Sequence, residues 1–332
     1  MNFRVLFALA LIALPAHAET NSSPLTRGEV RFRDHSNGVQ HPTYTAHRRQ
    51  TCAPAQAGDL RQRLVDLAAQ EWARFGYPIS QRIDARVLRQ VFPELRRAKQ
   101  PPYLERDPLM LQAIGGYWAA LTGVASGEIA DSGGFEIANA NAMWIEEAAQ
   151  YRANSGWATP WSAAFMSWLM CEAGVEDFRR SWAHRDYVDA AIAASDGGAS
   201  HPYRAHEPTQ APAVGDLLCS TRAYYRADLA TRRNEPDGEA QMHCDLVVAI
   251  DSATGLILAI GGNVENAVSL VPYRLMRTRA GSLVRSVCRG EKLCNDERLF
   301  AVLSLDAPAS AAALINAPAL YQRPDRPPPR MR

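Results

Sequence analysis

Three polar residues in separate predicted elements are of the types that nucleophilic catalysis uses: Ser162, His243 and Asn263. Ser162 lies at the predicted start of a helix in the stretch ATPWSAAFMSWLMCEAG, residues 158–174. A helix N-terminus has free backbone N–H groups and a partial positive charge. These lower the pKa of a thiol placed there and can stabilise an oxyanion. Serine is also a common N-cap residue, so a plain helix cap is the alternative interpretation of Ser162.

His243 and Asn263 belong to a predicted β-hairpin. The first strand starts at His243, and the return strand ends in Gly-Gly-Asn. A hairpin symmetric about Ala253 makes Ile250 face Leu256. On the same register His243 faces Asn263, whose amide can then accept the imidazole N–H and fix the tautomer. A slip of one residue would place the two side chains on opposite faces of the sheet.

Four further residues are candidates for holding the histidine or a substrate. Asp245 lies two residues along the strand from His243, so it shares the same face and is an alternative orienting group. His184 and Asp186 form a second polar pair in WAHRDYVDA. His184 is predicted at the rim of the pocket as a substrate contact or alternative base, and the alternative interpretation of this pair is a plain helix cap by Asp186. The predicted substrate-binding set is Trp161, His184, Asp186 and Asp245.

The composition is that of an ordinary soluble globular protein. Apolar residues make up 47% of the 332 residues and charged residues make up 21%. The formal net charge is +1, which gives no reason to expect a nucleic-acid partner.

The first 18 residues have the pattern of a secretory signal peptide. Arg4 precedes an apolar run over residues 5–14, and the small residues up to Ala18 offer a cleavage site. A membrane anchor is the alternative, but the run is shorter than the roughly 20 residues that span a bilayer. We therefore predict cleavage near Ala18, a periplasmic or secreted protein, and no membrane span after cleavage.

The chain has six cysteines, an even number that suits disulfides in an oxidising compartment. Cys288 and Cys294 flank a short polar loop and are predicted to form one bridge. Cys219 can pair with Cys244 across the sheet. Cys171 falls on the side of its predicted helix opposite to the serine, so it is poorly placed to act as the nucleophile. No paired C-x-x-C spacing suggests a metal site, and no cofactor is expected.

Helices come first and strands follow, which favours an α+β fold with an antiparallel sheet. A helical pattern starts at Asp59 and ends at Gly76, and further helical stretches follow. Residues 195–211 and 220–241 are predicted to be loops. Predicted strands cover residues 214–219, 243–250, 256–260, 267–271 and 299–305. The predicted parts of the chain are a signal peptide (1–18), a flexible linker (19–57), a hydrolase-type domain (58–306) and an Ala/Pro/Arg-rich tail (307–332).

Three stretches resemble motifs of papain-like bacterial cell-wall hydrolases of the CHAP amidase and NlpC types. PWSAAFMSWLMCEAG resembles their nucleophile helix, HCDLVVAI their histidine strand, and AIGGNVENAVSL the strand that follows. With FRRSWAHRDYVDAAI included, the chain most resembles a bacterial domain-of-unknown-function family, number 2272. The resemblance covers residues 58–305. It implies a papain-like fold, in which a helical half packs on an antiparallel sheet, and activity on amide bonds of cell-wall peptides.

The chain departs from those hydrolases at the nucleophile, because Ser162 stands where they have cysteine. A serine hydroxyl is far less acidic than a thiol, so Ser162 would depend on His243 as general base. The first expectation is a hydrolase of cell-wall peptide or peptidoglycan fragments that uses Ser162, His243 and Asn263. The second is a catalytically inactive domain that binds wall peptide or a protein partner. An acyl transferase or lipase on the same fold is the third.

Overall fold

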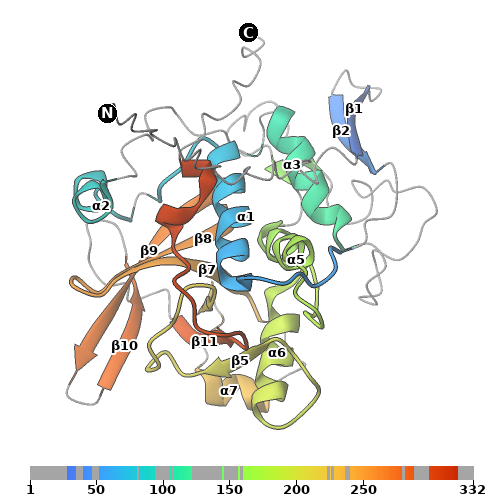
Figure 1. The fold of residues 1–332 in the computed structure, drawn as a ribbon. Helices are drawn as coiled ribbons and strands as arrows, with labels where there is room; N and C mark the ends of the chain where they lie inside the picture. Colours follow the sequence, from blue (N-terminus) through green and yellow to red (C-terminus); the bar gives the residue numbers. More distant parts are fainter. Residues whose placement is uncertain are drawn as a thin grey trace, which may run out of the picture.

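The computed structural model of the chain is an α+β fold in which helices pack on a curled antiparallel sheet (Figure 1). The predicted signal peptide and the end of the predicted tail lie outside the described residues. The structure describes residues 28–34, 40–46, 52–80, 82–93, 105, 108–121, 144–145, 156–157, 160–222, 225, 228–235, 240–278, 281–287 and 299–320.

Within these residues the central sheet has seven strands in the order β10-β9-β8-β7-β6-β11-β5, with antiparallel pairing throughout. The two edges approach each other, because the Val284 N–H of β10 donates to the Pro208 carbonyl just after β5 at 2.8 Å. The predicted α+β class is confirmed. The strands span Tyr203–His206 (β5), Leu217–Thr221 (β6), Met242–Asp251 (β7), Leu256–Val264 (β8), Ala267–Thr278 (β9), Gly281–Ser286 (β10) and Leu299–Leu305 (β11).

Strand β7 shows why the central strands are almost wholly apolar. Its first eight residues are all buried, because helices cover one face and the curl of the sheet encloses the other. Leu246 and Val248 belong to the core under the helices, whereas Val247 belongs to a second core inside the curl. His243 and Asp245 alternate in step with Val247 and therefore share its face of the strand.

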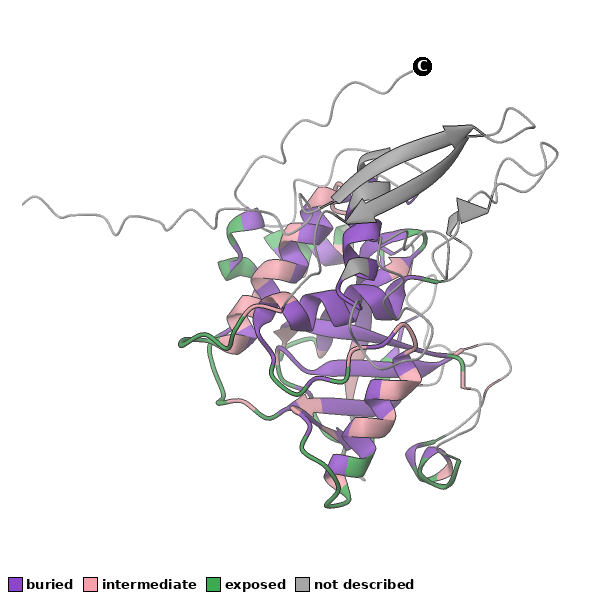
Figure 2. Cartoon of the chain, turned by 90° about the vertical axis from the view of Figure 1, so that its right-hand side faces the viewer, coloured by how far each residue is buried: buried purple, intermediate pink, exposed green. Residues whose placement is uncertain are grey.

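Helix α1 (Leu60–Arg74) lies against the sheet at the centre of the molecule (Figure 1). It begins where the Asp59 carboxylate accepts the Gln62 N–H, so the predicted helix between Asp59 and Gly76 is confirmed. Helix α5 (Ser162–Ala173) packs against α1 and the sheet and is buried on nearly all sides. Figure 2 shows that the helices and strands at the centre are buried almost throughout.

The remaining helices lie around this centre. None of the described helices has both the length and the apolar character needed to span a bilayer. The remaining helices are α2 (Ala85–Val91), α3 (Pro108–Ala119), α6 (His184–Ser195), α7 (Leu229–Asn234) and the short 3-10 helices Leu314–Asn316 and Pro318–Leu320.

Several segments predicted as linker or loop contain regular structure. Within the predicted flexible linker 19–57, β1 (Gly28–Asp34) pairs with β2 (Gln40–Ala46) in antiparallel register. Strand β5 and helix α7 lie in two predicted loops, and β9 continues beyond its predicted end at Val271 to pair with β10. A further short ladder pairs β3 (Trp144–Ile145) with β4 (Gly156–Trp157). Strand β5, helix α7 and the two-residue strands β3 and β4 are short and carry little periodicity, whereas Val30 and Phe32 of β1 do alternate with polar residues.

Two disulfides connect elements that are distant in the sequence. Cys219 of β6 and Cys244 of β7 face each other in the ladder with Cα atoms 4.1 Å apart, and the predicted bridge between them is confirmed. Cys52 is joined to Cys171, which ties the segment before α1 to α5. The predicted bridge between residues 288 and 294 lies outside the described residues.

Candidate active site

Ser162 is the first residue of α5, and its hydroxyl does not cap the helix. The N-cap is Trp161, which makes no side-chain cap hydrogen bond, so the interpretation of Ser162 as a plain N-cap is wrong. The hydroxyl oxygen lies 2.6 Å from Nε2 of His184, the first residue of α6. Both side chains are enclosed, because Ser162 is 3% exposed and His184 is 6% exposed.

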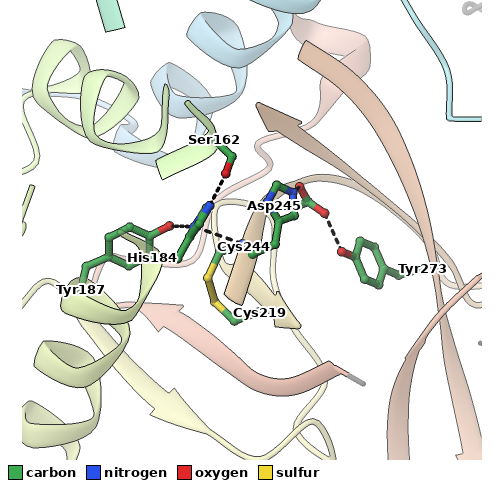
Figure 3. The surroundings of a disulfide bond; sticks show 8 residues. Ser162, His184, Tyr187, Cys219, Cys244, Asp245 and Tyr273 are labelled. Atoms are coloured by element: carbon green, nitrogen blue, oxygen red, sulfur yellow. Dashed lines mark hydrogen bonds and ion pairs between the residues drawn. A yellow bond between two sulfur atoms is a disulfide. The ribbon is translucent and has the colours of Figure 1, made fainter. Parts of the chain in front are cut away.

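His184 connects Ser162 to Tyr187, and these three residues are called the helix-side triad below (Figure 3). The Tyr187 hydroxyl contacts Nδ1 of His184. The backbone N–H of Cys244 donates to the same nitrogen at 3.2 Å. A ring nitrogen that accepts a backbone N–H carries no proton, so the neutral imidazole bears its proton on Nε2. In this tautomer His184 donates its Nε2–H to the oxygen of Ser162.

The buried position keeps His184 neutral. Burial lowers the pKa of His184 well below its ordinary value, and the charge that His243 carries when protonated and the charge of Arg222 lower it further. Burial also raises the pKa of Tyr187 well above its ordinary value, so its hydroxyl stays protonated and can donate. The helix-side triad thus contains no ionised group at neutral pH.

A second polar chain lies on the strands and consists of His243, Asp245 and Tyr273, called the strand-side triad below. Nε2 of His243 lies 2.7 Å from Oδ1 of Asp245, and the Tyr273 hydroxyl donates to Oδ2 at 2.6 Å. Burial acts to raise the pKa of Asp245, but the charge of His243 and the hydrogen bonds from both partners bring it below its ordinary value.

The ionised carboxylate fixes the orientation of His243. A carboxylate only accepts hydrogen bonds, so His243 donates to Asp245 from Nε2. When the imidazole is neutral, its lone pair is therefore on Nδ1. That is the protonation state in which a histidine can act as a general base through Nδ1.

The two triads meet at their histidines. The ring centroids of His184 and His243 are 5.0 Å apart, with an edge-on arrangement. Cys244 connects the two triads. Its neighbours in β7, His243 and Asp245, belong to the strand-side triad, and its own backbone N–H donates to His184. Among the described residues no group of three His, Cys, Asp or Glu side chains is arranged to hold a metal ion.

Two glycines of β8 make room for this arrangement. A Cβ atom on Gly261 would lie 1.7 Å from Oδ1 of Asp245, so only glycine allows β8 to pass this carboxylate. A Cβ atom on Gly262 would lie 2.6 Å from Cβ of Phe165, which belongs to α5. Gly261 therefore leaves space for the Asp245 carboxylate, and Gly262 leaves space for the helix that carries Ser162.

The structure places Asn263 outside the paired part of β7 and β8. The ladder keeps the predicted register at Leu246 and Ile260 and ends there. A bulge shifts the other end of the ladder, so Ile250 faces Ile257 and the predicted pairing of Ile250 with residue 256 is wrong. Asn263 has a positive φ of 56° in an irregular part of β8, where the strand pairs with β9. The partner that the structure shows for the His243 imidazole is Asp245, the alternative from the sequence.

Trp161 and Asp186, the other two predicted contacts, make their hydrogen bonds away from Ser162. Trp161 is fully buried, and its indole N–H donates to the Glu105 carboxylate at 2.8 Å. Asp186 accepts from the Ser181 hydroxyl just before α6. The structure therefore brings together Ser162 and three of the predicted partners, His184, His243 and Asp245, and leaves Trp161 and Asp186 at its margin.

Tyr187 and Tyr273 were not predicted from the sequence. Tyr187 follows His184 by one helical turn, so the i,i+3 rule could have indicated it. Tyr273 gives no such signal, because it comes from β9, which is separated from β7 by β8 in the sheet. Its contact with Asp245 depends on the curl of the sheet.

Comparison with known proteins gives one match. A family model described as an uncharacterized protein conserved in bacteria, domain of unknown function 2272, matches residues 105–305. The match includes every residue of both triads. No curated protein and no solved structure shows a significant match to the chain.

Proposed function

We propose a function for this chain on the premise that it belongs to the bacterial family of uncharacterized proteins designated domain of unknown function 2272. In this proposal the chain is an exported hydrolase of amide bonds in cell-wall peptides, with Ser162 as the nucleophile. The observation that carries it is the buried hydrogen bond between the Ser162 hydroxyl and His184, beside a second histidine paired with a carboxylate. Covalent hydrolases place a nucleophile near a histidine base that a third group orients. In this proposal the base is His243 and the orienting group is Asp245.

A papain-like architecture is part of the proposal. It is supported by the position of Ser162 at the N-terminus of a helix that packs on an antiparallel sheet, and by a histidine near the start of β7. The substrate class rests on the resemblance of three sequence motifs to cell-wall hydrolases and on the predicted signal peptide. Two disulfides are compatible with export to an oxidising compartment.

In the proposed reaction the Ser162 oxygen attacks the carbonyl carbon of an amide while its proton passes to Nδ1 of His243. A bridging water carries this proton, because the hydrogen bond described for the Ser162 oxygen is the one with His184, and none joins it to His243. The C–N bond then breaks, and His243 delivers the proton to the leaving amine. Water hydrolyses the acyl-enzyme by the same proton route, which releases a carboxylic acid and restores the serine.

Asp245 has the orienting role in this proposal, in place of Asn263. Its hydrogen bond to Nε2 of His243 selects the tautomer in which Nδ1 accepts a proton, and its charge stabilises the imidazolium that forms. The backbone N–H of Ser162 at the start of α5 contributes to binding the oxyanion.

A catalytically inactive domain that binds wall peptide or a protein partner is the second candidate. Two observations favour it. The oxygen of Ser162 accepts a hydrogen bond from His184 instead of donating its proton to a base, and the side chain is only 3% exposed. Ser162 has a hydroxyl where the similar cell-wall hydrolases have a thiol, and this weaker nucleophile also fits a protein that binds without cleaving.

Digestion of purified peptidoglycan by the mature protein, read by mass spectrometry, distinguishes the two candidates. The hydrolase proposal expects cleavage by the wild type and loss of cleavage in Ser162→Ala and His243→Ala. Ser167→Ala is the matched control. It removes a buried hydroxyl from the same helix, and that hydroxyl donates to the Ser181 carbonyl instead of contacting a histidine. Labelling by a fluorophosphonate probe should follow the same pattern.

The opposite pattern would favour binding. If the folded wild type leaves peptidoglycan intact while Ser162→Cys cleaves it, the site has lost its activity at one atom and the hydrolase proposal is wrong. If neither protein cleaves, pull-down with soluble wall peptides tests the binding function directly.

A further inference from the structure

The helix-side triad has a feature that a serine nucleophile needs and a thiol does not. A thiol ionises near neutral pH when it lies at a helix N-terminus, whereas a serine hydroxyl does not. We propose that His184 is a fixed hydrogen-bond donor to the Ser162 oxygen, which stabilises the developing alkoxide, and that it never serves as the base. This inference rests on the proposed hydrolase function and assigns the two histidines separate roles.

The backbone of β7 determines which nitrogen of His184 carries the proton. If Nδ1 were protonated, its proton would point at the Cys244 N–H, and two donors would face each other at 3.2 Å. Cys244 cannot easily turn away, because it lies in the β6–β7 ladder and is joined to the opposite residue, Cys219. The Tyr187 hydroxyl can rotate to donate to Nδ1 and so agrees with the same tautomer.

A donor on Nε2 helps the reaction more than it stabilises the resting serine. Hydrogen bonds to an ionised oxygen are roughly twice as strong as those to a neutral one. The 2.6 Å contact is buried, so water competes little for the oxygen. The partial charge at the start of α5 acts in the same direction. The neutral His184 therefore lowers the energy of the alkoxide, while His243 takes up the proton.

The charged and titratable groups around His184 agree with this division. Arg222 and His243 oppose a positive charge on His184, and Tyr187 faces it as a neutral hydroxyl. The carboxylate of this site, Asp245, binds His243 instead. Only His243 has an anionic partner that compensates the charge of a protonated imidazole.

Nitrogen NMR of the wild-type protein tests the tautomer without any need for activity. The protein is labelled with 15N at its histidines, and the His184 signals are assigned by comparison with His184→Gln. We expect a neutral ring at pH 7 with the proton on Nε2 and none on Nδ1. A proton on Nδ1, or a charged ring, would overturn the inference.

The pKa of a thiol introduced by Ser162→Cys measures the donor directly. It is followed by the ultraviolet absorbance of the thiolate against pH, with the wild type as reference. Adding His184→Leu removes the donor and should raise the thiol pKa by about one unit or more, a tenfold change in the thiolate fraction at a given pH. Adding His184→Gln retains an N–H donor and should recover most of the shift. An unchanged thiol pKa in the Ser162→Cys, His184→Leu protein contradicts the inference.

These measurements separate the inference from the proposed function. Neither depends on cleavage of peptidoglycan, so the donor role can hold in a protein that binds without cleaving. If cleavage occurs but the NMR tautomer is the opposite one, the hydrolase function stands and His184 becomes the base.

Discussion

The helix-side and strand-side triads contain the same two side-chain types, a histidine and a tyrosine, but we propose opposite proton roles for their histidines. In the helix-side triad the histidine accepts a backbone N–H, has no carboxylate partner among the residues that the structure describes, and stays neutral. In the strand-side triad it binds an ionised carboxylate that a tyrosine holds from the other side. The partner of the second ring nitrogen therefore decides whether a histidine donates a hydrogen bond or accepts a proton.

The largest expected effect comes from exchanging the two histidines for glutamine one at a time. His243→Gln removes the proposed general base, and under the hydrolase proposal it should lower kcat/KM on wall peptides by about 10²–10⁴-fold. His184→Gln keeps an N–H donor and should cost about tenfold. Steady-state kinetics of the two variants beside the wild type measure the ratio. A larger loss in His184→Gln than in His243→Gln would mean that the roles are reversed.

A methyl group added to β8 should break the strand-side triad through the backbone. Gly261→Ala would push a Cβ atom into the Asp245 carboxylate, and we expect it to lower the free energy of unfolding by more than about 3 kcal/mol. Gly197→Ala is the control, because its added Cβ meets nothing within 4 Å and only the positive φ of 87° costs about 1 kcal/mol. Urea unfolding of both variants gives the comparison. Equal losses would show that β8 can move away from the carboxylate.

The two triads also differ in how far the sequence could predict them. His243 and Asp245 are two residues apart in a strand, so alternation alone places them on one face. Ser162 and His184 start two different helices, and their contact depends on how α5 and α6 pack, which no local pattern encodes.

The hairpin register failed at one end for a similar reason. The bulge between Val247 and Ala249 adds a residue to β7, and nothing in the apolar run LVVAI marks its position. Helix α1 was predicted accurately because its cap and its apolar period lie in one continuous stretch. The sequence therefore predicts elements and same-face neighbours well, and contacts between elements poorly.

Removal of each tyrosine hydroxyl compares the two triads with the same substitution. Tyr273→Phe removes a hydrogen bond to the ionised Asp245, so we expect it to lower the free energy of unfolding by about 1.5–3 kcal/mol. Tyr187→Phe removes a bond to the neutral His184 and should cost about 0.5–1.5 kcal/mol. Chemical denaturation measures both values. A cost for Tyr187→Phe as large as that for Tyr273→Phe would indicate a charged His184.

The most gradual expected effect is a pH dependence of stability that belongs to the helix-side triad. Burial lowers the pKa of His184 below the 6.5 of an exposed histidine. Between the folded and unfolded pKa values the unfolded chain binds the proton and the folded protein does not, so stability rises with pH. The contribution is complete above about pH 6.5 and is lost as the pH falls from there to the folded pKa, at up to about 1.4 kcal/mol per pH unit.

His184→Gln should reduce this slope, which is measured by urea unfolding in steps from pH 7.5 to about pH 5. Part of the slope should remain, because burial also lowers the pKa of His201, and His201→Gln should remove that part. Asp245 acts in a different window, since its lowered pKa gives stability that is present above about pH 3.8 and is lost only below it. An unchanged slope in His184→Gln would mean that the helix-side histidine is protonated as easily as an exposed one, and burial would then not be what keeps it neutral.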